Sequence, residues 1–249
     1  QQNAEKQAPA DATIKEPNLA NWFYEPSWKR VSGYTKPQLP FNSEGACWLL
    51  FIDQTGVADQ LAEWLSTSVK NLIKVAEGKE FVRRGPYEFD VDSSDPKSYE
   101  RLFQALKQEK LFPNRIVHAW GIATPDEQLP APPGFYSLLF LAQSLGVNGH
   151  EKDVHIDVVS TNIYEVTGTE SVSPLHAMLK GPCLVIPQEY AGVTCRLIDL
   201  CHEEINHQDN FVLSRGLLEN LYKPGIETLA YRGGHLWTQF FDEIETNST

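Results

Sequence analysis

The sequence lacks the features of several classes of protein. Its 249 residues contain no apolar run of the ~18–20 residues that span a bilayer, and its start lacks the basic-then-apolar layout of a signal peptide. Basic residues are few, 21 against 33 acidic ones, and the net charge of -12 argues against a nucleic-acid partner or an anionic membrane surface. The four cysteines form no C-x-x-C pair, so we expect inert free thiols in a cytoplasmic globular protein.

Motifs that carry common chemistry are missing as well. There is no Walker loop and no G-x-S-x-G elbow. The most metal-like cluster is Cys201–His207, whose histidines, His202 and His207, stand five residues apart. That spacing would rotate them roughly 140° from each other on a helix, whereas zinc-binding histidines share a face at a spacing of four. We therefore expect an exposed, charged loop here and no metal site.

Apolar runs of strand length alternate with helical patterns, which predicts an α/β fold built on a parallel, doubly wound sheet. Asp95 and Pro96 have the N-cap and first-turn pattern of a helix start. The expected strands are Cys47–Asp53, Asn71–Glu77, Tyr87–Val91, Arg115–Ile122, Val154–Thr161, Pro182–Ile186, Val193–Leu200, Gly225–Arg232 and His235–Phe241. The expected helices are one ending near Leu65, one opening at Pro96, Gly134–Leu145, Pro174–Leu179 and Asn210–Tyr222.

The first strand-to-helix turn resembles a nucleotide-binding turn without its glycines. Against the form T-G-x-x-x-G-x-G, Thr55 and Gly56 fit, whereas Gln60 and Ala62 replace the second and third glycines. Glycines are needed there so that backbone amides can approach a pyrophosphate at the helix N-terminus. We expect the Gln60 side chain to occupy the space of a phosphate, so the turn keeps its geometry and binds no nucleotide.

Residues for carbonyl reduction are not in the expected pattern either. A short-chain reductase has a Tyr thirteen residues after its Ser and a Lys or Asn four further on. Counted from Ser160, those positions hold Ser173 and Ala177, so Ser160 is expected to be a local hydrogen-bonding residue. Glu77 could hold a ribose hydroxyl but is expected to be a solvated acid, and His118 is expected to be a core residue.

Six stretches of the sequence form an ordered set: Trp22–Lys29, Val117–Trp120, Gly168–Glu170, Lys180–Cys183, Pro187–Tyr190 and Cys195–Asp199. In order and in register, they resemble the ketoreductase region of modular polyketide synthases. The likeness runs from about Asn21 to Ile244. In that family the region has two halves derived from the short-chain dehydrogenase fold. The first is a structural subdomain without cofactor, and the second binds NADPH and reduces β-ketoacyl intermediates.

The resemblance is to the first half, and it implies a truncated Rossmann-like sheet whose terminal strands pair, Trp22–Arg30 against strands around Leu229–Phe241. It implies a structural subdomain at 19–245 and a tail at 246–249 that leads to a catalytic subdomain. Residues 1–18, rich in Gln, Ala, Lys and Pro, are expected to be a disordered linker.

The implied function is non-catalytic support for the NADPH-dependent half, with no catalytic, cofactor-binding or metal-binding residue in this chain. The implied partners are the catalytic ketoreductase subdomain and neighbouring synthase domains, with the acyl carrier protein met only indirectly. Such a half should expose an apolar patch. Its candidates are Leu236, Trp237, Phe240 and Phe241, for which burial within the fold is the alternative.

Three other readings stay open at this point. The chain could be a pseudo-ketoreductase half that scaffolds neighbouring synthase domains. It could be a free-standing NADP-dependent short-chain oxidoreductase that binds its cofactor through Thr55, Gly56 and Glu77. It could also be a small-molecule binding module that uses the crevice beyond the strand ends.

Overall fold

The structure, a computed structural model, describes residues 22–31, 46–123, 134–148, 153–205, 211–221 and 228–244. The linker predicted at 1–18 and the tail predicted at 246–249 lie outside these ranges. The strands are β1 (Tyr24–Arg30), β2 (Cys47–Ile52), β3 (Asn71–Glu77), β4 (Val82–Arg83), β5 (Glu88–Val91), β6 (Arg115–Gly121), β7 (Val154–Thr161), β8 (Val193–Leu200), β9 (Thr228–Arg232) and β10 (His235–Glu243). The helices are α1 (Val57–Ser66), α2 (Pro96–Gln108), α3 (Phe135–Asn148), α4 (Pro174–Ala177), α5 (Lys180–Glu189) and α6 (Phe211–Leu221).

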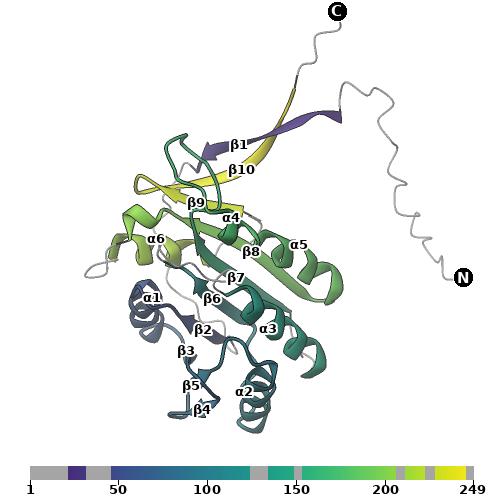
Figure 1. The fold of residues 1–249 in the computed structure, drawn as a ribbon. Coiled ribbons are helices and arrows are strands. Elements are labelled where there is room, and N and C mark those ends of the chain that lie inside the picture. Colours follow the sequence, from purple (N-terminus) through teal and green to yellow (C-terminus); the bar gives the residue numbers. More distant parts are fainter. Residues whose placement is uncertain are drawn as a thin grey trace, which may run out of the picture.

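The strands form one ten-stranded sheet in the order β1-β10-β9-β8-β7-β6-β2-β3-β5-β4 (Figure 1). The central strands from β5 to β9 are parallel, and β4, β10 and β1 add antiparallel pairs at the two edges. Strand β2 lies between β3 and β6, so the order of the chain reverses there, at the point where open α/β sheets bind ligands beyond their carboxyl ends. The predicted doubly wound α/β sheet is confirmed.

Helices cover both faces of the sheet, and each face has its own apolar core. Helices α2, α3 and α5 pack on one face through Leu102, Leu138 and Ile186, among others. Helices α1 and α6 pack on the other through Leu61 and Leu217. The predicted start of α2 is confirmed, because the Asp95 carboxylate accepts a hydrogen bond from the Lys97 backbone N–H at 3.1 Å and Pro96 occupies the first turn.

One connection of the sheet is shorter than in a full doubly wound fold. Parallel strands β3 and β5 are joined by residues 78–87, a stretch that the structure describes completely and that contains β4 in place of a helix. A parallel crossover usually needs a dozen or more residues and a helix to cover the sheet. The truncation that the resemblance implied therefore lies here. The two-residue strand β4 was missed by the sequence analysis because its side chains are exposed and form no apolar pattern.

The strand predicted at Pro182–Ile186 is wrong, because this stretch belongs to helix α5. A short apolar run is compatible with either a buried strand or a buried helix. Pro182 is tolerated because it lies in the first turn, where the backbone N–H has no partner within the helix. The helix is also what the topology requires, since it provides the crossover between the parallel strands β7 and β8.

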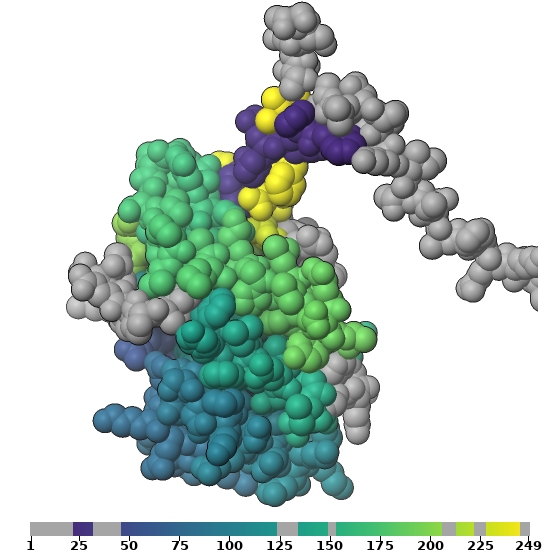
Figure 2. Space-filling view, turned by 45° about the vertical axis from the view of Figure 1, so that its right-hand side comes forward, coloured from purple at the N-terminus to yellow at the C-terminus, as the bar shows by residue number. Residues whose placement is uncertain are grey.

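The two ends of the described chain form an arm that stands out from the body (Figures 1 and 2). Strand β1 pairs antiparallel with β10 along its whole length, from Tyr24 opposite Glu243 to Arg30 opposite Trp237. The predicted pairing of the terminal strands is thus confirmed. Strand β9 pairs with β10 only up to Thr238, so the outer part of β10 lies beyond β9. The hairpin between β9 and β10 turns at Gly233 and Gly234, which have φ values of 59° and 70°.

Candidate functional site

The turn between β2 and α1 is occupied by a carboxylate of the chain itself. Asp53 follows β2 and is almost completely buried. Its Oδ1 accepts a hydrogen bond from the Ala58 backbone N–H at 2.7 Å, and its Oδ2 accepts one from the Thr55 N–H at 2.8 Å and another from the Thr55 hydroxyl. Ala58 lies in the first turn of α1, so an amide that could face a phosphate already faces an anionic oxygen. Gly56, with φ 86°, provides the left-handed residue that the turn requires.

The two residues that replace glycines lie on α1. Ala62 is buried in the core beneath the helix. Gln60 is half-buried, and its side-chain Oε1 is buried with no hydrogen-bond partner among the residues that the structure describes. Both replacements were evident from the sequence, whereas Asp53 was expected only as the last residue of a strand. A signal was present, because an aspartate two residues before a threonine is a common turn pattern in which the carboxylate accepts the backbone N–H two positions on.

The predicted Ser160 position lies at the end of β7, also at the carboxyl edge of the sheet. Its hydroxyl is completely buried and donates a hydrogen bond to the Gly121 carbonyl at 2.8 Å, as expected of a local hydrogen-bonding residue. Ser173 is the N-cap of α4 and accepts a hydrogen bond from the His176 backbone N–H at 3.4 Å. Ala177 ends that helix. These three residues therefore have structural roles in local packing and capping.

The loop between β7 and α4 is held closed by a buried group of charges centred on Arg232 of β9. Its guanidinium donates to the Glu170 carboxylate at 3.0 Å, to the Asp199 carboxylate at 2.5 Å and to the Tyr164 carbonyl at 2.9 Å. All three charged side chains are 3% exposed or less. Two of the stretches that resemble ketoreductases, Gly168–Glu170 and Cys195–Asp199, supply these carboxylates.

Each carboxylate also accepts backbone hydrogen bonds. Asp199 accepts from the N–H groups of Ile163 and Tyr164, which follow β7. Burial raises the pKa of Asp199. The Arg232 charge and these N–H groups lower the pKa, but they offset only part of the rise. Glu170 accepts from the N–H of Thr167 at 2.9 Å and from neighbouring loop amides. Burial acts to raise the pKa of Glu170, but the hydrogen bonds outweigh it and lower the pKa to about 2.

His118 is a core residue, as predicted, and lies on the same side of the sheet as α3. Its ring is completely buried against Phe51, and its Nε2 lies 2.7 Å from the Ser137 hydroxyl oxygen. Its Nδ1 is buried without a partner among the described residues. Burial lowers the pKa of His118 to about 3, so the ring stays neutral at physiological pH. Glu77 ends β3 as an exposed acid that accepts a hydrogen bond from the Ser93 hydroxyl.

The thiols and the metal-like cluster show no reactive arrangement. Cys183 lies in helix α5, not in a strand as predicted, and Cys195 lies in β8. A hydrogen bond with Cys183 and burial raise the pKa of Cys195, and burial raises the pKa of Cys201 to about 11, so both favour the unreactive thiol. In the part of the chain that the structure describes, no three His, Cys, Asp or Glu side chains could hold a metal ion. His207 lies outside that part.

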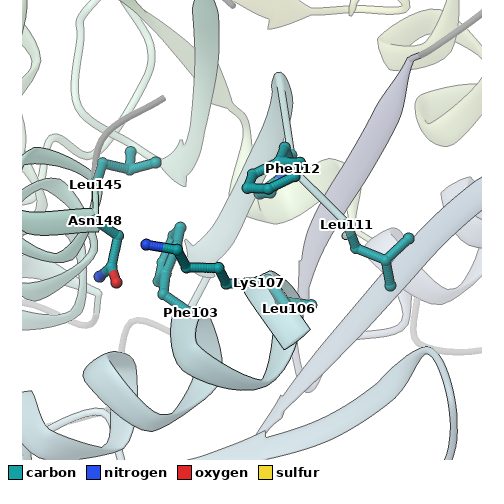
Figure 3. Close-up of a pocket in the computed structure, with 8 residues that line it drawn as sticks. Phe103, Leu106, Lys107, Leu111, Phe112, Leu145 and Asn148 are labelled. Atoms are coloured by element: carbon teal, nitrogen blue, oxygen red, sulfur yellow. The ribbon is translucent and has the colours of Figure 1, made fainter. Parts of the chain in front are cut away.

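A hollow lies at the opposite edge of the sheet, between the ends of α2 and α3 and the start of β6 (Figure 3). It is mostly apolar and open to solvent. Because β6 begins there, this is the amino edge of the parallel strands, away from the crevice where Rossmann-like folds bind nucleotides. The residues that line it are Phe103, Leu106, Lys107, Leu111, Phe112, Pro113, Leu145 and Asn148. Among the described helices, none is long and apolar enough to cross a membrane.

The chain is similar to a known protein family and to several solved structures. A family model described as beta-ketoacyl synthase-like, N-terminal, matches residues 48–219. No curated protein matches the sequence.

Solved structures extend the likeness over more of the chain. A structure of the adenylation, ketoreductase and pseudo Asub domains of a keto acid-selecting NRPS module is similar with a TM-score of 0.75 at 22% identity, over 92% of this chain and 19% of that one. An N-terminal ketoreductase from the macrolactin assembly line is similar with a TM-score of 0.71 at 16% identity, over 90% of this chain and 45% of that one. A mutant short-chain dehydrogenase/reductase of Serratia marcescens has a TM-score of 0.52 at 12% identity, over 76% of this chain and 96% of that one.

These likenesses establish a ketoreductase-like, short-chain-dehydrogenase-like fold, as the sequence predicted. The chain spans less than half the length of the macrolactin ketoreductase and about a fifth of the NRPS structure.

Proposed function

Because this chain belongs to the beta-ketoacyl synthase-like N-terminal family, we propose that it is the structural, non-catalytic half of a ketoreductase region. In this proposal the chain binds no NADPH and reduces no ketone. It positions a second half that binds NADPH and reduces β-ketoacyl groups carried by an acyl carrier protein. The activity of the whole region then depends on the contact between the halves.

The observation that carries the proposal is the closed carboxyl edge of the sheet. In a Rossmann-like enzyme this edge must admit a dinucleotide and a substrate. Here the Asp53 carboxylate already accepts a hydrogen bond from the Ala58 backbone N–H at the N-terminus of α1. An anion placed there would meet a like charge at close range, which is unfavourable in a buried site. The loop that follows β7 is fixed to β9 by hydrogen bonds from Arg232 to the Glu170 carboxylate and the Tyr164 carbonyl.

The experiment that tests this function compares two polypeptides, the present chain and one that continues through the second half. NADPH fluorescence titration should show no saturable binding by the present chain at micromolar concentration. The longer polypeptide should bind NADPH and reduce a β-ketoacyl thioester. Saturable binding of NADPH and reduction of a ketone by these 249 residues alone would instead identify a free-standing oxidoreductase.

A second candidate function is a pseudo-ketoreductase half that scaffolds neighbouring synthase domains. The fold of this chain is equally compatible with it, because a supporting half would be built in the same way whether or not the second half is active. The same assays separate the two candidates. For a pseudo-ketoreductase, the longer polypeptide should fold but neither bind NADPH nor oxidise it.

A further inference from the structure

Strand β4 forms the edge of the sheet opposite to the arm (Figure 1). It has only two residues and pairs antiparallel with β5, with Val82 opposite Asp90 and Arg83 opposite Phe89. Strands usually have three to ten residues, so the backbone hydrogen bonds of this pair are too few to hold β4 in place. Other contacts must fix it, and two neighbouring arginine side chains supply them.

The Arg84 side chain fixes the hairpin on one face of the sheet. Arg84 follows β4, and its Nε lies 2.7 and 2.8 Å from the two carboxylate oxygens of Asp90. One of its terminal nitrogens donates to Asp90 Oδ2 at 2.5 Å. The Asp90 side chain is 8% exposed, whereas that of Arg84 is 65% exposed. The guanidinium therefore covers a nearly buried carboxylate of β5 while its own outer side stays in water.

The Arg83 side chain fixes β4 on the other face. Its terminal nitrogen donates to Glu109 Oε1 at 2.8 Å, directly after α2. Its guanidinium carbon lies 5.9 Å from the centre of the Phe89 ring, and Phe81 stacks on the same ring with centres 6.1 Å apart. Because successive residues of an extended chain point to opposite faces, Arg83 and Arg84 hold the hairpin from both sides.

The backbone groups that β4 covers belong to the outer edge of β5. The carbonyls of Tyr87 and Val91 accept hydrogen bonds from N–H groups of β3 and of the residue that follows it. Alternate residues of a strand turn their N–H and C=O groups toward opposite neighbours, so those of Glu88 and Asp90 face outward. The Glu88 carbonyl accepts a hydrogen bond from the Arg84 N–H at 2.9 Å. Removal of β4 would leave these outward groups unpaired.

An unpaired edge of this kind would be prone to association. Free N–H and C=O groups at a sheet edge are a template for a strand of another chain, and short, charged edge strands are a common protection against it. Phe89 and Val91 of β5 are of the types that favour strands. Four of the six residues at 79–84 are charged, which opposes the addition of a further strand to β4. Two identical edges can pair about a twofold axis, so a second copy of this chain always offers a matching edge.

We propose that β4 is an edge guard: held by Arg83 and Arg84, it keeps the outer edge of β5 from pairing with the β5 edge of a second copy of the chain. This role is independent of the proposed function. It explains why the shortened connection between β3 and β5 contains a strand with two arginines at its end. Loss of the two arginine contacts should convert the edge into a site of self-association.

Sedimentation velocity of the present chain tests the guard. Arg83→Thr with Arg84→Thr removes both side-chain contacts, and threonine itself favours a strand. The concentration at which half of the chain is dimeric should fall by about tenfold or more relative to the wild-type chain. Lys97→Thr with Arg101→Thr is the matched control, because it removes the same charge from exposed side chains of α2. An equal change in the two variants, or none in either, would overturn the proposal.

Hydrogen–deuterium exchange locates the contact. At low protein concentration, peptides that cover β5 should exchange faster in the guard variant than in the wild-type chain. They should regain protection as the dimer forms at higher concentration. Peptides that cover β7 and β8 should exchange as in the wild-type chain, which shows that the fold is intact. Protection gained at another surface in place of β5 would overturn the proposal.

A single substitution replaces the double variant if that variant unfolds. Arg83→Thr alone leaves the nearly buried Asp90 carboxylate paired with Arg84, so the fold should be kept. It should still lower the concentration of half-dimerisation by more than the control pair does. A value equal to that of the control would overturn the proposal.

Discussion

The β2–α1 turn and the loop between β7 and α4 both lie at the carboxyl edge of the sheet, but different kinds of contact close them. In the turn, Asp53 bonds to Thr55 and Ala58, two and five residues further along the chain. In the loop, Arg232 bonds to Glu170 and Tyr164, which are 62 and 68 residues away. The contacts in the turn are therefore local, as in a helix cap. The contacts in the loop form only when β9 and the segment after β7 come together in the folded sheet.

The difference has a consequence for stability. A local cap can be lost while the helix that it precedes stays packed, because α1 is held by its buried apolar residues. A buried cation shared by two carboxylates cannot be lost in this way, because no other contact compensates the charge that its loss leaves in the core. We therefore expect changes in the loop to act on the whole fold and changes in the turn to act nearby.

The largest effect is expected for Arg232→Ala. It leaves the buried Asp199 and Glu170 carboxylates without their cation, which should lower the free energy of unfolding by about 3–5 kcal/mol. Urea denaturation would measure this. Arg30→Ala, at an exposed arginine that contacts His235, should change stability by about 0.5 kcal/mol or less. Equal effects of the two variants would show that the buried network adds nothing.

Acid should weaken the loop in a defined range of pH. The folded-state pKa of Glu170 is lowered from 4.5 to about 2, so its carboxylate stabilises the fold above the unfolded-state value and that contribution is lost as pH falls toward 2. The stability difference between the wild-type chain and Glu170→Gln should be full above pH 5 and shrink between about pH 4.5 and 2. Thermal unfolding followed over that range would measure it. A difference that stays constant with pH would exclude Glu170 as the titrating group.

A smaller effect is expected in the turn. Asp53→Ala removes the acceptor of the Ala58 N–H and should cost about 1–2 kcal/mol, the range of a lost helix cap. Asp53→Asn keeps an acceptor oxygen and should cost less. Hydrogen exchange should report the loss at the start of α1, with β9 unaffected. Increased exchange throughout the sheet would contradict this prediction, because it would show that loss of Asp53 destabilises the whole fold, as is expected for loss of Arg232.

The smallest effect is expected for Gln60→Gly. Glycine in a helix costs about 1 kcal/mol, and removal of a buried carbonyl oxygen that has no partner in the described part of the chain offsets part of that cost. The variant should still fail to bind NADPH in a fluorescence titration, because Asp53 continues to occupy the turn. If binding appeared in Gln60→Gly but not in Asp53→Ala, the Gln60 side chain would be the group that closes the turn.

Much of the fold could be predicted because its local signals agree with its packing. The bounds of β7 and β8 are those expected from their apolar runs, and the start of α2 follows from Asp95 and Pro96. The prediction failed at Pro182–Ile186, where a short apolar run fits a strand or a helix and only the crossover between parallel strands decides. It also missed β4, which has two exposed residues and no pattern.

The apolar surface was predicted in part. Of its candidates on β10, Phe241 is 64% exposed and Phe240 36% exposed, as predicted, while Leu236 is buried and Trp237 half-buried. The exposed face of α5 was not predicted, because the stretch was assigned to a strand. Alternation along a strand would have placed Leu184 and Val185 on opposite sides, whereas in a helix they share one face.

The sequence by itself determined what depends on neighbours in the chain: the alternation of strands and helices, the helix starts, and the missing glycines at Gln60 and Ala62. These follow from backbone sterics and side-chain periodicity, which act over a few residues. Only the tertiary structure decided that Arg232 closes the loop after β7 and that the arm and α5 share one side of the sheet. Those relations join residues that are distant along the chain, and no local pattern encodes which of them the parallel sheet brings together.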